Sequence, residues 1–228
     1  MSQKDAWEAE YQKPKLLKIG QKPRVDLLNY LKFLKKKEGL TLENLTILDL
    51  GSGNGKNANY LASLGNQVFG LEISPTAMAL AQKEAKGKGL KANYQLADIG
   101  REFPFVEGTF DLVLDIMTSN SLTEAERENY LTEVSRVLKP GGYFFLRALC
   151  LEGDKNAKNL LKLSPGPEYH TYINQIMNLT ERVFTEKDLR NTYGRYFNFQ
   201  KLIKKTNYAE FQGQLYKRNY WLAYLRKL

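Results

Sequence analysis

The chain has 228 residues, which is enough for one α/β domain with a sizeable buried core and too few for two comfortable domains. Hydrophobic residues make up 43% and charged residues 26%, as in ordinary globular proteins, and no apolar run reaches the length of a membrane span. The polar N-terminal residues do not resemble a signal peptide, and the lone Cys150 excludes an internal disulfide. We therefore expect a cytoplasmic protein that does not insert in a membrane.

The net charge of +9 is unevenly distributed along the chain. Residues 1–40 carry ten Lys and Arg against five Asp and Glu, and residues 182–228 carry eleven against three. The segment between them has a net charge of −4. Basic flanks could attract an anionic substrate or RNA, and the alternative interpretation is a solvated lysine surface.

Short apolar runs alternate with stretches of helical periodicity, which predicts βαβ units and a mostly parallel sheet. Strands are expected over residues 45–50, 67–73, 91–97, 110–116 and 143–149. Helices are expected over residues 23–38, 57–64, 75–87, 123–138 and in a short segment after 185. We expect a single domain, with an N-terminal helical cap (1–40), a core (41–150), an insert or lid (151–181), and a C-terminal helix and hairpin (182–228).

Two aromatic-rich runs close the chain, over residues 196–203 and 216–225. They could pair as an antiparallel hairpin with aromatic side chains inward and basic side chains outward. The same interleaving is also found on platforms that bind single-stranded RNA.

A glycine-rich turn, Leu-Asp-Leu-Gly-Ser-Gly-Asn-Gly, follows the first predicted strand at residues 48–55 and enters a helix. Glycines permit a tight turn and a close approach of ligand to backbone. Glu72 lies 21 residues after Gly51, at the end of the next predicted strand, where an acid suits a ribose diol. The pattern predicts a nucleoside cofactor; the alternative is a glycine turn with a chance acid nearby.

The spacing of this turn distinguishes between nucleoside cofactors. It reads Gly51-x-Gly53-x-Gly55, whereas a dinucleotide fingerprint reads G-x-G-x-x-G and a phosphate loop needs G-x-x-x-x-G-K-[ST]. Asp49, two residues before the first glycine, would sit poorly beside a pyrophosphate but fits the ammonium of a methionine moiety. This pattern favours S-adenosylmethionine over NAD.

Residues 49–55 resemble motif I of the class I S-adenosylmethionine-dependent methyltransferases, and Glu72 resembles their ribose-binding acid. Residues 97–99 are similar to the motif whose acid accepts the adenine amino group, and residues 109–115 and 137–142 are similar to two later motifs of that family. The resemblance covers residues 40–150. It implies a doubly wound, mostly parallel seven-stranded sheet with an antiparallel last strand and helices on both faces. The implied activity is transfer of a methyl group from S-adenosylmethionine, with S-adenosylhomocysteine as product.

The resemblance also implies the residues that hold the cofactor. They are Asp49, Gly51, Ser52, Gly53, Asn54, Gly55, Glu72, Ile73, Asp98, Ile99 and Asp115. Asp115 contacts cofactor or acceptor, or else has a structural role, and Asp111 is expected to be structural.

The acceptor is expected to be a small-molecule O, N or S nucleophile, because the motifs of DNA methyltransferases are missing. His170, the only histidine, could act as a base from the insert, or be an ordinary loop histidine. Trp7, Tyr11 and Tyr169 are candidates for substrate contact. Trp7 and Tyr11 faintly resemble a segment that covers the cofactor in methyltransferases of the tellurite-resistance type, or they simply anchor a helix.

Two further functions compete with this one. The basic flanks suggest an RNA- or ribosome-directed methyltransferase, and a protein that binds the cofactor without chemistry would share the same motifs. No metal site is expected, because the sequence has no His/Cys cluster and no convincing carboxylate set. The sequence carries no indication of oligomeric state.

Overall fold

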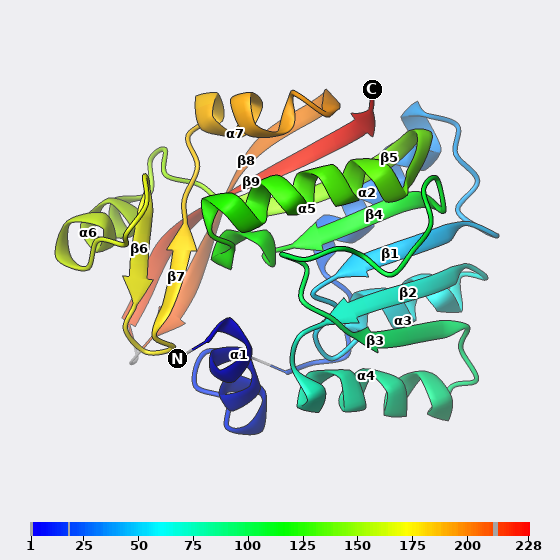
Figure 1. The fold of residues 1–228 in the computed structure, drawn as a ribbon, viewed down its shortest axis with the longest axis horizontal. Helices are drawn as coiled ribbons and strands as arrows, with labels where there is room; N and C mark the ends of the chain where they lie inside the picture. The colour runs from blue at the N-terminus through cyan, green and yellow to red at the C-terminus, as the bar shows by residue number, and fades with distance from the viewer. Residues whose placement is uncertain (1, 18, 212–213) are drawn as a thin grey trace.

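A computed structural model describes residues 2–17, 19–211 and 214–228 and contains a seven-stranded sheet of order β3-β2-β1-β4-β5-β9-β8 (Figure 1). The strands are β1 (Thr46–Leu50), β2 (Gln67–Glu72), β3 (Ala92–Leu96), β4 (Phe110–Ile116), β5 (Leu138–Leu149), β8 (Phe197–Phe211) and β9 (Gln214–Lys227). Strands β1 to β5 pair in parallel, and β9 is antiparallel to both β5 and β8. The predicted sheet with its antiparallel last strand is confirmed.

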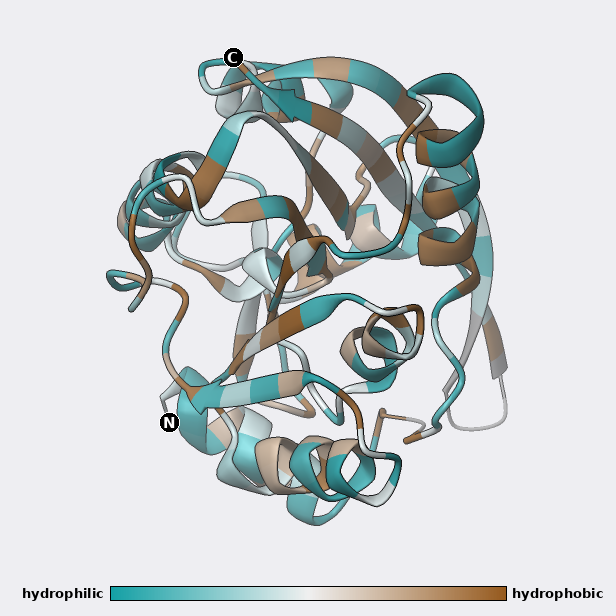
Figure 2. Cartoon of the chain, turned by 90° about the vertical axis from the view of Figure 1, so that its right-hand side faces the viewer, coloured by the Kyte–Doolittle hydropathy of each residue, from teal (hydrophilic) through white to brown (hydrophobic). Residues whose placement is uncertain are grey.

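Helices cover both faces of the sheet, as predicted (Figure 1). They are α1 (Gln3–Gln12), α2 (Val25–Lys37), α3 (Lys56–Ser63), α4 (Pro75–Gly87), α5 (Glu124–Val137), α6 (Lys155–Leu163) and α7 (Glu186–Tyr193). One buried cluster joins the sheet to α5 and α7, and a second joins it to α2 and α3. Hydrophobic and hydrophilic residues alternate along the helices (Figure 2), so a helix presents one apolar side to the sheet, whereas the central strands β1 and β4 are buried on both faces.

Strand β5 begins earlier than the sequence suggests, at Leu138 rather than Tyr143. Leu138 pairs with Phe110, and the register shifts before Leu112 pairs with Tyr143. The Lys-Pro-Gly-Gly segment is thus an irregular entry to the strand rather than a separate turn. Gly141 has a φ of 69°, a conformation that suits glycine at such a bulge.

The insert contains α6 and a separate two-stranded sheet of β6 (Thr171–Asn174) and β7 (Leu179–Arg182), which the sequence analysis did not predict. Its apolar residues pack against the end of β5 in a third buried cluster, which includes Leu149, Tyr172 and Val183. No helix in the described part of the chain is long and apolar enough to cross a bilayer.

Candidate active site

One cavity of about 430 Å³ lies at the carboxyl ends of β1, β2 and β4. Chain order reverses between β1 and β4, and ligands of open α/β sheets bind at such a switch point. The residues that line the cavity include Trp7, Tyr11, Arg24, Asp49, Gly51, Ser52, Gly53, Asn54, Lys56, Glu72, Ile73, Asp98, Ile99, Met117, Thr118 and Tyr208. Eleven of the fifteen residues predicted for cofactor contact, substrate contact or catalysis are among those that line it.

The glycine turn is shaped by backbone conformation and by close neighbours. Gly51 and Gly53 have φ values of 61° and 57°, which side chains other than glycine rarely adopt. A Cβ on Gly51 would overlap the Thr118 side chain, and one on Gly53 would overlap the Tyr11 hydroxyl. Both glycines are therefore required by the cavity wall as well as by the turn.

Asp49 lies at the end of β1 with 2% of its surface exposed. Burial, together with the charges of Glu72 and Asp115, raises the pKa of its carboxyl to about 8. In the described part of the chain, Asp49 Oδ2 and the Ser52 hydroxyl are buried without a hydrogen-bond partner. Buried polar atoms are normally paired, so these two atoms indicate a site for a polar ligand.

Glu72 ends β2 and holds the glycine turn against the cavity. Its Oε2 accepts a hydrogen bond of 2.7 Å from the Gly53 amide, and its Oε1 accepts from the amides of Ile73 and Ser74 at 2.8 and 2.9 Å. Burial raises the pKa of this carboxyl, while the three amides oppose that shift. A carboxylate can accept about four hydrogen bonds, so Glu72 retains capacity for a ligand.

Asp98 and Ile99 follow β3 and line the cavity beside Ile73. Asp98 Oδ1 accepts a 2.8 Å hydrogen bond from the Gly100 amide, and 38% of the side chain is exposed. Its other oxygen is 3.9 Å from Arg101 Nε, a contact too long to fix the carboxylate strongly. Asp98 is thus available at the surface of the site.

Helix α1 lines one side of the cavity with Trp7 and Tyr11, the two residues for which a covering role and a helix-anchoring role were both considered. Between them, Glu8 anchors the helix by accepting 2.6 Å hydrogen bonds from the hydroxyls of Ser74 and Thr76 at the start of α4. These two hydroxyls lower the pKa of Glu8 to about 2. The anchoring carboxylate is therefore ionised throughout the physiological range.

The structure places Asp115 behind the cavity wall. It is fully buried, and its oxygens accept hydrogen bonds from the Thr118 amide at 2.8 Å, the Ser119 amide at 3.2 Å and the Tyr130 hydroxyl at 2.6 Å. These contacts favour the structural alternative, because the carboxylate is occupied in holding the turn after β4. Gly55 also lies outside the cavity lining, since it forms the left-handed N-cap of α3 with a φ of 77°.

His170 and Tyr169 do not line the cavity either. The His170 Nδ1 atom lies 2.9 Å from Asp188 Oδ2, and the imidazole stacks on Tyr169 at a centroid distance of 3.8 Å. The turn that carries them packs toward α7, and 63% of Tyr169 is exposed. Their positions do not favour catalysis or substrate contact.

Several cavity residues were not predicted from the sequence. Tyr208 arrives from the far end of the β8–β9 hairpin, and Arg24 and Lys56 bring two cations. Met117 has a φ of 75°, an uncommon conformation for a non-glycine residue that is often found at functional sites. Only the aromatic character of the tail hinted at Tyr208. No cluster of three or more His, Cys, Asp or Glu among the residues the structure describes could hold a metal ion.

Comparisons with known proteins agree with this geometry. Residues 47–142 match a family model described as a methyltransferase domain. An uncharacterized methyltransferase of Synechocystis is 39% identical over 113 residues, which cover 47% of this chain and 51% of that protein. An uncharacterized methyltransferase of Schizosaccharomyces pombe is 34% identical over 102 residues, which cover 45% of this chain and 70% of that protein.

This chain belongs to the class I S-adenosylmethionine-dependent methyltransferase family. A SAM-dependent methyltransferase from Methanosarcina mazei superposes with a TM-score of 0.74 at 25% identity, over 91% of this chain and 99% of that one. The match to the Synechocystis relative spans about half of that protein, and it falls on the cofactor-binding core. The family cofactor, S-adenosylmethionine, suits the two unpartnered polar atoms beside the glycine turn.

Proposed function

We propose that this protein transfers the methyl group of S-adenosylmethionine to an O, N or S atom of a small molecule. The observation that carries the proposal is the pair of unpartnered atoms, Asp49 Oδ2 and Ser52 Oγ, in the wall of a cavity at the switch point of the sheet. Glu72 and Asp98 border the same cavity from β2 and from the end of β3.

The chain offers a group for each polar part of the cofactor. Asp49 suits the ammonium, and the cations Arg24 and Lys56 suit the carboxylate of the methionine moiety. Glu72 suits the ribose diol, and Asp98 suits the adenine amino group. When bound, the cofactor supplies a sulfonium methyl group.

The contribution of the protein to catalysis is then chiefly positioning and exclusion of water. Tyr11 lies over Gly53, and Trp7 lines the cavity from the same helix, so α1 shields one side. Tyr208 lines it from the hairpin. No imidazole borders the cavity in the described residues, which suits an acceptor atom that needs no strong base.

The relatives support a small-molecule acceptor. They include a protein named demethylmenaquinone methyltransferase from Thermus thermophilus, 34% identical over 131 residues. Another is named 2-heptyl-1-hydroxyquinolin-4(1H)-one methyltransferase from Mycobacteroides abscessus, 33% identical over 101 residues. Both names describe the methylation of a small molecule rather than of a nucleic acid.

Calorimetric titration with S-adenosylmethionine, S-adenosylhomocysteine and NAD tests the proposal. We expect micromolar binding of the two sulfur nucleosides and no binding of NAD. Asp98→Asn should weaken S-adenosylhomocysteine binding, whereas Glu102→Gln, an exposed acid four residues away, should not. Binding of NAD instead, or of none of the three, would contradict the proposed cofactor. Release of S-adenosylhomocysteine during an acceptor screen would then exclude a non-catalytic binding protein.

A further inference from the structure

Four cations gather toward the β5 side of the cavity. Arg24 and Lys56 line it, and Arg147 and Lys205 converge on Asp26 next to Arg24. We call Arg24, Lys56, Arg147 and Lys205 the basic cluster. Arg147 belongs to β5, which is separated by three strands from β3 and the adjoining Asp98. The basic cluster is thus remote from the adenine end of the proposed cofactor site.

The basic cluster contains four cations, and two of them share a single carboxylate, that of Asp26. Arg147 Nε is 3.0 Å from Asp26 Oδ2, and Lys205 Nζ contacts the other oxygen of the same carboxylate. Within the described ranges, neither Arg24 nor Lys56 has an ion pair. Burial lowers the pKa values of Lys56 and Arg147, and the charge of Arg24 lowers both further. Unmatched cations in a buried setting are costly, so a ligand anion would be favourable there.

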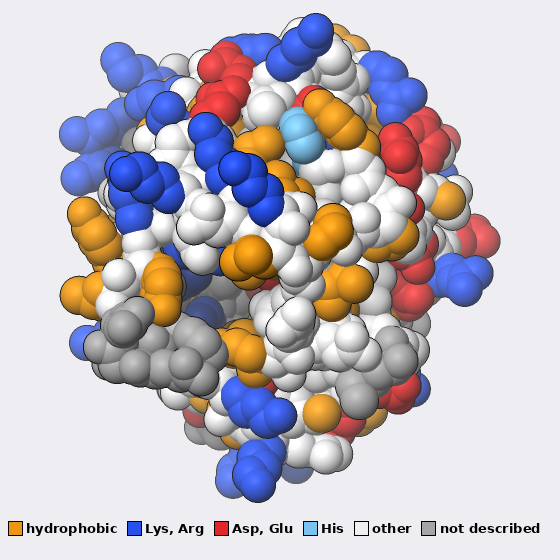
Figure 3. Space-filling model, turned by 90° about the vertical axis from the view of Figure 1, so that its left-hand side faces the viewer, with side chains coloured by type: hydrophobic (Ala, Val, Ile, Leu, Met, Phe, Trp, Pro, Cys, Tyr) orange, Lys and Arg blue, Asp and Glu red, His pale blue; other side chains and the backbone are white. Residues whose placement is uncertain are grey.

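Two members of the basic cluster, Arg24 and Lys56, line the cavity itself, and the amide of the cavity residue Met117 donates a 2.9 Å hydrogen bond to the Arg147 carbonyl. The Arg147 guanidinium stacks on Tyr220 at 3.6 Å from the ring centroid. Tyr220 and the cavity residue Met117 pack against the same buried cluster beneath the insert. Figure 3 shows a hollow on the face that carries the insert, with Lys and Arg side chains on its wall.

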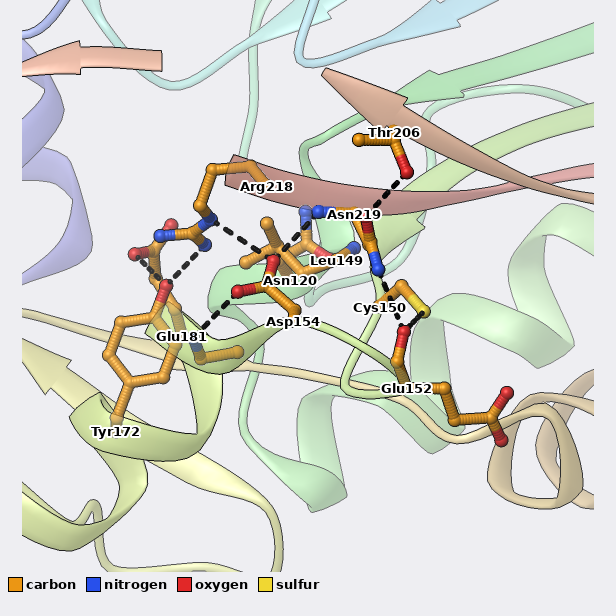
Figure 4. A network of polar contacts seen from close by, with 11 residues as sticks. Asn120, Leu149, Cys150, Glu152, Asp154, Tyr172, Glu181, Thr206, Arg218 and Asn219 are labelled. Carbon is orange, nitrogen blue, oxygen red and sulfur yellow. Dashed lines mark hydrogen bonds and ion pairs between the residues drawn. The ribbon is translucent and has the colours of Figure 1, made fainter. Parts of the chain in front are cut away.

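A neighbouring arginine shows what a matched charge looks like in this region. Arg218 Nη2 donates a 3.0 Å hydrogen bond to the Tyr172 hydroxyl, and Arg218 Nε lies 3.7 Å from Asp154. Tyr172 in turn donates to Glu181 at 2.9 Å (Figure 4). One carboxylate thus lies near the guanidinium and a second is reached through the Tyr172 hydroxyl, so Arg218 has a structural role.

The cofactor itself would not neutralise the basic cluster. Its ammonium and carboxylate charges cancel, and its sulfonium adds one positive charge. Its carboxylate would occupy Arg24 or Lys56, which leaves Arg147 and Lys205 sharing Asp26. We propose, on the basis of the function proposed above, that the methyl acceptor is a small organic anion whose acidic group is bound by Lys205, the partly exposed cation next to the buried pair of Arg147 and Asp26.

The test compares matched acids and amides on protein loaded with S-adenosylhomocysteine. The probes are benzoate with benzamide, salicylate with salicylamide, and hexanoate with hexanamide, titrated by calorimetry or ligand-observed NMR. The wild type should bind at least one acid about fivefold more tightly than its amide, the range of a partly exposed ion pair. Lys205→Met should lose that preference, and Lys205→Arg should keep it. Lys204→Met, an exposed neighbour without an ion pair to Asp26, is the matched control for net charge.

Every outcome of this titration either supports or contradicts an anionic acceptor. Equal binding of every acid and amide by the wild type, or no binding of any probe, overturns it, as does an unchanged preference in Lys205→Met. Affinity for S-adenosylhomocysteine should stay within about twofold in all three variants, because Lys205 lies outside the proposed cofactor contacts. A chain that does not bind S-adenosylhomocysteine contradicts the proposed function, whereas one that binds it without an acid preference contradicts only this inference.

Discussion

Asp49 shows how burial gives one carboxyl two possible charge states. Water is excluded from its surroundings, and Glu72 and Asp115 add negative charge, so its pKa rises to about 8 although Lys56 opposes the shift. Near neutral pH the free protein therefore holds mainly the protonated form. An ammonium group would restore the ionised form, because the two charges attract strongly in a site of low polarity.

The first prediction follows from this exchange of a proton for a cation. The folded pKa of Asp49 is raised, so binding of an ammonium ligand must release a proton below about pH 8. Affinity for S-adenosylhomocysteine should fall by about tenfold for each pH unit from 8 to 6. Calorimetry at pH 7 in two buffers of different protonation enthalpy should count about one released proton per ligand.

Asp49→Asn provides the control for that experiment. The variant should bind more weakly at pH 8 and should lose most of the pH dependence, since its amide does not titrate in this range. A wild-type affinity that stays constant from pH 6 to 8 would show that Asp49 does not contact the ammonium.

Among the helices and strands, α1 has the most direct effect on the site. It contacts α4 through Glu8, and Glu10 accepts hydrogen bonds from the amides of Lys15, Leu16 and Leu17 in the loop that follows. The Glu8 carboxylate thus fixes the helix against α4, and the Glu10 carboxylate fixes the loop that follows it. Both the helix and the loop line the cavity.

Removal of the Glu8 anchor should loosen this cover without unfolding the sheet. We expect Glu8→Ala to weaken S-adenosylhomocysteine binding by about tenfold, the effect of losing charged hydrogen bonds. The melting temperature should change little, because α1 lies outside the two main buried clusters. Hydrogen exchange should show faster exchange of the α1 amides. Lys4→Ala, at an exposed position of the same helix, should leave all three measurements unchanged.

Parts of the site that lie in short local motifs could be predicted from the sequence. Parts whose position depends on the pairing of distant strands could not. The glycine turn, Glu72 and Asp98 were found because strand ends of a parallel sheet meet at one edge. Tyr208 was missed because the reach of the β8–β9 hairpin depends on its pairing over Phe197–Phe211, which no local motif specifies. His170 was considered as a base because it lies in the insert, with an ordinary loop histidine as the alternative. Periodicity does not encode the path of the insert, and the structure places the imidazole beside Asp188.

Tyr208 provides the third prediction. It lines the cavity from β8, and 69% of its surface is exposed. We therefore expect Tyr208 to contact a bound acceptor rather than the cofactor. Tyr208→Ala should raise the KM of any acceptor that shows turnover by about three- to tenfold through loss of aromatic contact. S-adenosylhomocysteine affinity should stay within about twofold. Tyr169→Ala, an exposed tyrosine away from the cavity, is the control, and an equal effect there would assign Tyr208 no special role.

At the scale of the whole molecule, the positive charge of the N-terminal flank lies in two separate places. Arg24 precedes α2 at the cavity, whereas Lys35, Lys36 and Lys37 end that helix about 20 Å away, given its 13 residues. Glu38, next in sequence, hydrogen-bonds to Tyr143 at the beginning of the regular part of β5. The positive charge of this flank is thus divided between the carboxyl ends and the amino ends of the parallel strands.

This division predicts weak, salt-sensitive binding of RNA. Fluorescence anisotropy with labelled bulk tRNA should give a Kd weaker than about 1 µM at 200 mM KCl, as for non-specific contacts. Replacing Lys35, Lys36 and Lys37 with Glu should reduce the binding seen at 50 mM KCl, whereas Lys205→Met, at the cavity, should alter it little. If RNA were the acceptor, RNA binding would depend on Lys205 more than on Lys35, Lys36 and Lys37. Tight binding at 200 mM that requires Lys205 would assign the basic cluster to a nucleic-acid phosphate and contradict a small organic acceptor.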